Sequence, residues 1–186
     1  MNTIDPIDIA LNNSIEFSGD GNSLKTGKNC CVENISVAFF GNDNQMVIGS
    51  DTNVCKSTFV FEGTGNTLTV GDGVLVWDTL SISLLGHGGN VIIGDGCLFS
   101  NHVHIRNNDG HKIFNSGSEL LNPSRDVVIG ARVWVCENVH ILKGSVIGND
   151  SVVGAGSVVT GKVYPPNSVI AGNPAKVIRT GIHWKI

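Results

Sequence analysis

The sequence predicts an all-β protein whose chain winds into a parallel β-helix, and three observations support this fold class. Residues 129–164 divide into six hexads, in which the first residue is always Ile or Val and the fifth is Val or Ser. The fourth position favours residue types that adopt positive φ easily, namely Asn138, Gly144, Asp150 and Gly156. A period of six matches neither an amphipathic helix nor an alternating strand, and it is typical of a solenoid whose coils bury one inward-pointing apolar side chain after another.

A longer repeat precedes the hexads. The pattern Gly-x-x-Asn recurs at Gly19, Gly41 and Gly63, each two residues after a Phe, and a fourth, degenerate copy begins at Gly86, which gives steps of 22, 22 and 23 residues. Gly and Asn are typical of turns that need positive φ. We therefore interpret each copy as one corner of a coil and not as a phosphate-binding loop.

The hexads begin near Ile93, and one long excursion interrupts them. Residues 107–127 follow no period, and such an excursion from a regular solenoid is uncommon unless it is functional, so we predict an active-site loop there. Pro165 and Pro166 end the repeat. The predicted organisation is an N-terminal arm (1–14), a β-helix (15–168), and a C-terminal tail (169–186) that covers the open edge of the last coil.

Length, charge and cysteine content restrict the function classes. A chain of 186 residues fits one domain. We expect a cytoplasmic protein without a transmembrane segment or signal peptide, and the odd number of cysteines without CxxC spacing indicates reduced, mostly buried thiols. The net charge of −4 argues against nucleic acid as a partner. Because residues 1–92 carry −7 and residues 93–186 carry +3, an anionic ligand is expected on the C-terminal half.

The hexads, the tail Ala171-Gly-Asn-Pro-Ala-Lys-Val-Ile-Arg179 and the loop Asp109-Gly-His111 together resemble the hexapeptide-repeat acyltransferases. Within that family, Asp-Gly-His followed by Asn122-Pro-Ser-Arg-Asp126 and Ile129-Gly-Ala-Arg-Val-Trp134 is similar to bacterial capsular polysaccharide and polysialic-acid O-acetyltransferases. The resemblance covers about residues 15–186. It implies a left-handed parallel β-helix, a homotrimer with active sites between neighbouring subunits, and acetyl-CoA as the donor.

By this resemblance His111 matches the catalytic histidine of the loop, and Trp134 matches the tryptophan that partners it. Histidine titrates near neutral pH, so it suits a base that takes the proton of a sugar hydroxyl. Trp134 occupies the sixth place of its hexad, where a side chain faces outward. It could stack on a sugar or on the donor, or donate its N–H to a developing oxyanion. Asp109 could orient the imidazole or serve the turn.

The resemblance also implies a donor site. Ala155 and Thr160 match residues that contact the pantetheine arm through the main chain, and Lys176 and Arg179 match residues near the CoA phosphates. Galactoside-specific relatives carry a Lys directly after the matched Thr, whereas this chain has Gly161 there and Lys162 one position later.

Three functions remain open. The leading prediction is an acetyl-CoA-dependent O-acetyltransferase that acts on a sugar hydroxyl of a surface polysaccharide or its precursor, with His111 as general base. The second is acetyl transfer to an amino sugar or a xenobiotic amine. The third is a non-catalytic β-helix trimer, or a metal-bearing, carbonic-anhydrase-like one with ligands such as His102, His104 and His140. Because the sequence lacks a second convincing ligand set, we predict no metal.

Overall fold

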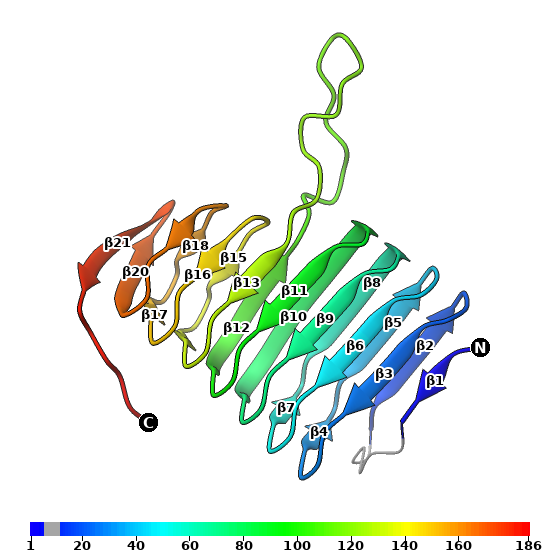
Figure 1. Ribbon diagram of the computed structural model, residues 1–186, viewed down its shortest axis with the longest axis horizontal. Coiled ribbons are helices and arrows are strands. Elements are labelled where there is room, and N and C mark those ends of the chain that lie inside the picture. The colour runs from blue at the N-terminus through cyan, green and yellow to red at the C-terminus, as the bar shows by residue number, and fades with distance from the viewer. Residues whose placement is uncertain (6–11) are drawn as a thin grey trace.

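The computed structural model describes residues 1–5 and 12–186, and it shows short strands stacked coil upon coil along one axis (Figure 1). Within these ranges there is no helix, and hence none that is long and apolar enough to cross a membrane. The strands form sheets of eight and 13 members, in which the paired strands are parallel except for the last pair. The predicted all-β solenoid is therefore confirmed.

The coils present three faces, which we name the first, second and third face. The first face is the eight-stranded sheet, made of β1 (Thr3–Ile4), β3 (Ser23–Thr26), β6 (Gln45–Ile48), β9 (Thr67–Val70), β11 (Asn90–Ile93), β13 (Val127–Ile129), β16 (Val146–Ile147) and β19 (Val163–Tyr164). The second face contains β4 (Cys31–Glu33), β7 (Asn53–Cys55), the starts of β10 (Leu75–His87) and β12 (Leu98–Arg106), β14 (Trp134–Val135), β17 (Val152–Val153) and β20 (Ser168–Gly172).

The third face contains β2 (Ser14–Ser18), β5 (Ser36–Phe40), β8 (Thr58–Thr64), the ends of β10 and β12, β15 (His140–Ile141) and β18 (Val158–Val159). β10 and β12 each cross from the second face to the third, and Thr79 and His102 adopt φ values of 47° and 55° within them. The final strand, β21 (Ala175–Thr180), runs antiparallel to β20 and ends the solenoid.

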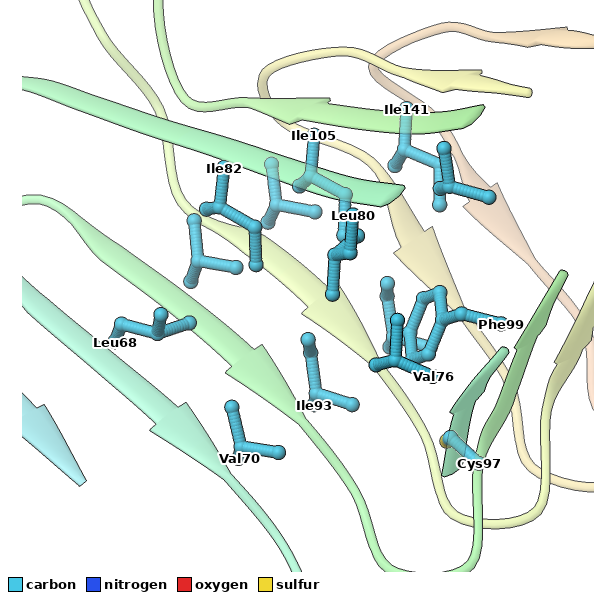
Figure 2. Packing of buried hydrophobic residues seen from close by; sticks show 14 of the residues in the cluster. Leu68, Val70, Val76, Leu80, Ile82, Ile93, Cys97, Phe99, Ile105 and Ile141 are labelled. Carbon is cyan, nitrogen blue, oxygen red and sulfur yellow. The ribbon is translucent and has the colours of Figure 1, made fainter. Parts of the chain in front are cut away.

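The core lies along the solenoid axis. Figure 2 shows apolar side chains from different faces, including Leu68, Ile82, Ile93 and Ile105, pointing into this common interior. The first residues of the hexads are buried as expected, namely Ile129, Val135, Ile141, Ile147, Val153 and Val159. In the N-terminal coils, the rings of Phe17, Phe39 and Phe61 stack with centroids 5.1 and 4.6 Å apart.

A buried ladder of asparagines builds the corners of the N-terminal coils. The side chain of Asn44 donates to Asn22 Oδ1 at 3.0 Å, and that of Asn66 donates to Asn44 Oδ1 at 3.1 Å. Asn44 Nδ2 also donates to Gly63 O at 3.0 Å, so the amides satisfy buried backbone groups of the next coil. The interpretation of this repeat as corners is confirmed.

The coil length changes along the chain. Corner asparagines in the N-terminal half are 22 residues apart, whereas equivalent residues among the hexads, such as Ala131 and Asn149, are 18 apart. The last hexad shortens the coil to 17, as between Ser151 and Ser168. Consequently Val163 points outward with 77% of its surface exposed, and Tyr164, at 3%, takes the inward place.

The predicted N-terminal arm, 1–14, contains β1, which joins the first face, and the start of β2, while its residues 6–11 lie outside the described residues. The predicted tail, 169–186, contains most of β20 and all of β21. These domain bounds stay predictions. All five cysteines are free thiols, but only Cys97 is buried, so the expectation of mostly buried thiols is wrong.

Candidate active site

Residues 107–126, which we name the hairpin loop, leave the solenoid between β12 and β13 and project far from it (Figure 1). The loop is an antiparallel ribbon, because Phe114 and Leu120 form a bridge near its tip. Its root is closed where Arg125 N donates to Asn107 O at 2.9 Å. The interruption of the repeat is therefore an ordered hairpin that carries His111 out from the coils.

Asn122 joins the two sides of the hairpin loop. Its Nδ2 donates to His111 O at 2.8 Å and to Asp109 Oδ2 at 3.0 Å. Its Oδ1 accepts from Ile113 N at 2.6 Å. One amide from the returning strand thus holds the carbonyl of His111 and the N–H of Ile113, and it also contacts the Asp109 side chain two residues before His111.

Asp109 accepts a hydrogen bond from Lys143 Nζ at 2.6 Å, and the same ammonium donates to Pro123 O at 3.1 Å. Burial would raise the pKa of the Asp109 carboxyl, but the hydrogen bonds from Lys143 and Asn122 outweigh it and lower the pKa below its ordinary value. The carboxylate is thus engaged by an ammonium and an amide, and neither of these hydrogen bonds involves the imidazole of His111.

A pocket of about 510 Å³ lies between the hairpin loop and the ends of β8 and β10. Titratable and polar groups line it from both sides. The loop supplies Asn108, Asp109, His111, Lys112 and Asn122, and the coils supply Glu62 and His87 beside the apolar Leu85. This size and the hydrogen-bonding groups on the walls suit a small polyhydroxylated molecule.

Two corner glycines form the part of the pocket that lies against the coils. Gly63 and Gly86 have φ values of 109° and 108°, which favour glycine. A Cβ on Gly86 would lie 2.7 Å from Ser124 Oγ, and one on Gly63 would lie 2.1 Å from Gly86 O. The missing side chain of Gly86 therefore lets the returning strand of the loop pass close to the coil, and that of Gly63 lets its corner pack against the corner at Gly86.

Trp134 lies elsewhere, on the second face. Its indole N–H donates to Ser100 Oγ at 3.2 Å, and its ring centroid lies 6.0 Å from that of Trp184 with a tilt of 43°. Trp184 is fixed in turn by donating its own N–H to Arg132 O at 2.8 Å. Trp134 does not line the pocket of His111, so a single chain does not bring these two predicted site residues together there.

The predicted donor residues lie near the C-terminal end of the solenoid. Ala155 is exposed in the turn between β17 and β18, and Thr160 follows β18, where its carbonyl accepts from Tyr164 O–H at 3.3 Å. Lys176 and Arg179 are exposed on β21. Within the part of the chain that the structure describes, neither cation forms an ion pair or a side-chain hydrogen bond, so both are available to a ligand.

The histidines considered as metal ligands are arranged differently from a metal centre. The rings of His104 and His140 stack with centroids 5.0 Å apart, while His102 occupies a positive-φ corner. Burial, followed by the neighbouring His140, lowers the pKa of His104. Among the residues with described positions, no group of three or more His, Cys, Asp or Glu side chains could hold a metal ion.

Sequence reasoning missed three residues of these sites. Lys143 sits in an ordinary hexad corner, 34 residues from Asp109, and no local pattern indicates their contact. Trp184 lies in the aperiodic tail. The sequence did contain an indication of His87, because a histidine stands there at the position that Asp20, Asn42 and Thr64 occupy in the earlier corner repeats.

Comparison with known proteins gives matches in both halves of the fold. Residues 126–161 match the family model described as bacterial transferase hexapeptide (six repeats). WbbJ of Escherichia coli K12, provisionally named a lipopolysaccharide biosynthesis O-acetyl transferase, is 40% identical over 122 residues, which is 60% of this chain and 60% of WbbJ. The chain thus spans less than two thirds of the length of this curated relative.

Two solved structures match almost the whole chain. The polySia-specific acetyltransferase NeuO is 31% identical, with a TM-score of 0.72, over 94% of this chain and 89% of NeuO. The polysialic acid O-acetyltransferase OatWY is 29% identical, with a TM-score of 0.78, over 100% of this chain and 92% of OatWY.

Proposed function

The chain belongs to the hexapeptide-repeat acetyltransferases, and from this membership we propose that it transfers the acetyl group of acetyl-CoA to a sugar hydroxyl of a surface polysaccharide or its precursor. The pocket beneath the hairpin loop carries the proposal, because it places a histidine among groups that can bind hydroxyls. The names of NeuO, OatWY and WbbJ support a polysaccharide as the acceptor.

In this proposal His111 is the general base. Its imidazole removes the proton of the acceptor hydroxyl while the hydroxyl oxygen attacks the thioester carbonyl. The tetrahedral intermediate then collapses, the C–S bond breaks, and the imidazolium returns the proton to the departing CoA thiolate. Because Asp109 is held by Lys143 and Asn122, the position of His111 depends on its main chain and not on a carboxylate partner.

Trp134 has a stacking role in this proposal. Its N–H is already used by Ser100 Oγ, which disfavours donation to an oxyanion, while the ring remains able to pack on a sugar or on the donor. Ala155 and Thr160 contact the pantetheine arm through their main chains. Lys176 and Arg179 bind the CoA phosphates, because both cations are exposed and lack partners among the described residues.

We propose that the working enzyme is a homotrimer whose sites lie between subunits. The projecting hairpin loop carries exposed apolar side chains, namely Ile113, Phe114, Leu120 and Leu121. Such a cluster on a protruding segment is typical of an interaction surface. Docking of this loop on a neighbouring subunit would bring His111 toward the neighbour's Trp134, which a single chain does not achieve.

The activity is tested by measuring CoA thiol release with polysialic acid and other oligosaccharides as acceptors. We expect His111→Ala to abolish transfer while the fold and CoA binding persist. Unchanged turnover would remove His111 from the mechanism. An acetyl product that resists mild alkali is an amide and would replace the proposal by N-acetyl transfer, whereas an alkali-labile product is the expected ester.

The shared site is tested by subunit complementation. His111→Ala and Trp134→Ala chains, each inactive alone, are co-expressed, and mixed trimers are purified through two different tags. Mixed trimers then contain some interfaces with both native residues, so part of the activity should return. Absence of recovery in verified mixed trimers would contradict a site built from two subunits.

A further inference from the structure

We propose that Lys143 is a positioning residue that holds the hairpin loop so that His111 is presented to the pocket. This inference rests on the proposed function, in which His111 is the base. Lys143 does not line the pocket and lies in the corner between β15 and β16, one coil beyond the root of the loop. It therefore acts through other residues and not on the substrate.

The ammonium of Lys143 joins both strands of the hairpin loop. Asp109, on the outgoing strand, accepts at 2.6 Å, and the carbonyl of Pro123, on the returning strand, accepts at 3.1 Å. Only 17% of the Lys143 side chain is exposed, against 63% for Lys56 in its ion pair with Asp78. Limited exposure reduces screening by water, and hydrogen bonds from a cation are stronger than neutral ones.

The contact continues from Lys143 to the main chain of His111. Asp109 Oδ2, which accepts from Lys143, also accepts from Asn122 Nδ2 at 3.0 Å. The same Nδ2 donates to His111 O at 2.8 Å, and Asn122 Oδ1 accepts from Ile113 N at 2.6 Å. Lys143, Asp109 and Asn122 thus form a continuous network that ends on the main chain of the proposed base and of Ile113.

The network matters because the loop projects from the solenoid and its outer part is exposed. A general base must come within hydrogen-bond reach of the proton that it removes, and a displacement of about 1 Å can reduce the rate roughly 100-fold. Loss of the network should therefore slow the chemical step. It should affect donor binding much less, because the predicted donor residues lie on other coils and on β21.

The first test compares Lys143→Met with Lys56→Met, which removes a lysine from an exposed ion pair far from the loop in sequence. We expect Lys143→Met to lower kcat by about 10- to 100-fold, with the KM for acetyl-CoA and the melting temperature nearly unchanged. Lys56→Met should keep the wild-type kcat. An unchanged kcat in Lys143→Met, or an equal loss in both variants, would overturn the proposal.

A double-mutant cycle and a chemical rescue separate positioning from a general effect. If Lys143 acts through Asp109, the variant that combines Lys143→Met with Asp109→Ala should be no slower than the slower single variant. Multiplied losses would contradict the network. Alkylation of Lys143→Cys with 2-bromoethylamine rebuilds an ammonium of similar reach and should restore activity, with treated wild type as the control for the five native cysteines.

Hydrogen exchange gives a readout that needs no acceptor. Exchange within residues 109–122 should be faster in Lys143→Met than in the wild type and in Lys56→Met. Equal exchange would overturn the positioning role, even if the enzyme is active. Conversely, if the wild type transfers acetyl to no acceptor, the proposed function fails while the exchange experiment still decides whether Lys143 orders the loop.

Discussion

The ring of Trp134 lies 6.0 Å from the ring of Trp184, so the C-terminal tail places a second indole beside the predicted site tryptophan. This relationship joins residues 50 positions apart and requires the chain to fold back after β21. Asn167 holds the tail in this position, because its Nδ2 donates to Ile182 O at 3.2 Å and its main-chain carbonyl accepts from Ile182 N at 3.0 Å. The tail is thus part of the surroundings of Trp134.

Trp184→Ala should reduce acetyl transfer by up to about tenfold, because a tilted aromatic pair contributes about 0.5–1.5 kcal/mol and Trp184 restricts the orientation of Trp134. The measurement is kcat/KM, together with the tryptophan fluorescence spectrum. Trp77→Ala is the matched control, since Trp77 is 71% exposed and makes no described ring contact. Equal activity of Trp184→Ala and wild type would show that the tail does not support Trp134.

The fold could be predicted from the sequence because the solenoid is local. Each hexad contains the residues of one turn and one inward-pointing apolar residue. The burial of Ile129 and Ile141 can therefore be predicted from their own hexads, without knowledge of the rest of the chain. The positive φ of Asn138 and Asp150 is equally local. The departure from the repeat is also a local signal: it led to the prediction of a loop at residues 107–127, and the chain leaves the solenoid between β12 and β13.

The surroundings of the predicted site residues could not be predicted, because they depend on contacts between distant segments. The contact of Lys143 with Asp109 requires the loop to fold toward the following coil, and the contact of Trp184 with Trp134 requires the tail to turn back. The sequence also does not predict that the last coil is one residue shorter, which exposes Val163 and buries Tyr164. Both residues are compatible with a strand, so neither marks the change of register.

Phe39→Ala should destabilise the protein by about 3–5 kcal/mol, because Phe39 is fully buried in the middle of the stack with Phe17 and Phe61. Its neighbour Phe40 points to the other side of β5 and is 41% exposed, so Phe40→Ala should change stability much less. Denaturant unfolding followed by circular dichroism measures both variants. Similar losses in the two variants would contradict the inward assignment of Phe39.

Lys176→Ala and Arg179→Ala should each raise the KM for acetyl-CoA by about tenfold, because each removes a charge-assisted contact with phosphate. The kcat should change little. The same variants should use acetyl-pantetheine, which lacks the nucleotide phosphates, as well as the wild type does. Lys25→Ala, a charge loss on β3, is the control. If the KM rises for acetyl-pantetheine as well as for acetyl-CoA, Lys176 and Arg179 contribute to folding or to another step and not to phosphate binding.

Acid should release the hairpin loop in the wild type but not change it further in Asp109→Ala. Burial would raise the pKa of Asp109, but hydrogen bonds from Lys143 and Asn122 outweigh it and lower the pKa below its ordinary value of 3.8. Because the pKa of Asp109 is lower in the folded protein, its contact with Lys143 is fully present above pH 3.8. The contact is lost as the pH falls through the folded-state pKa. Pepsin, which cleaves beside Phe and Leu at acid pH, should therefore cut near Phe114 and Leu120 much faster at a pH well below 3.8 than at pH about 4.5 in the wild type, after correction with an unstructured peptide of the loop sequence. Asp109→Ala should be cut readily at both values, because its loop lacks the contact throughout. Equal protection of the two proteins at the higher pH would show that other contacts hold the loop.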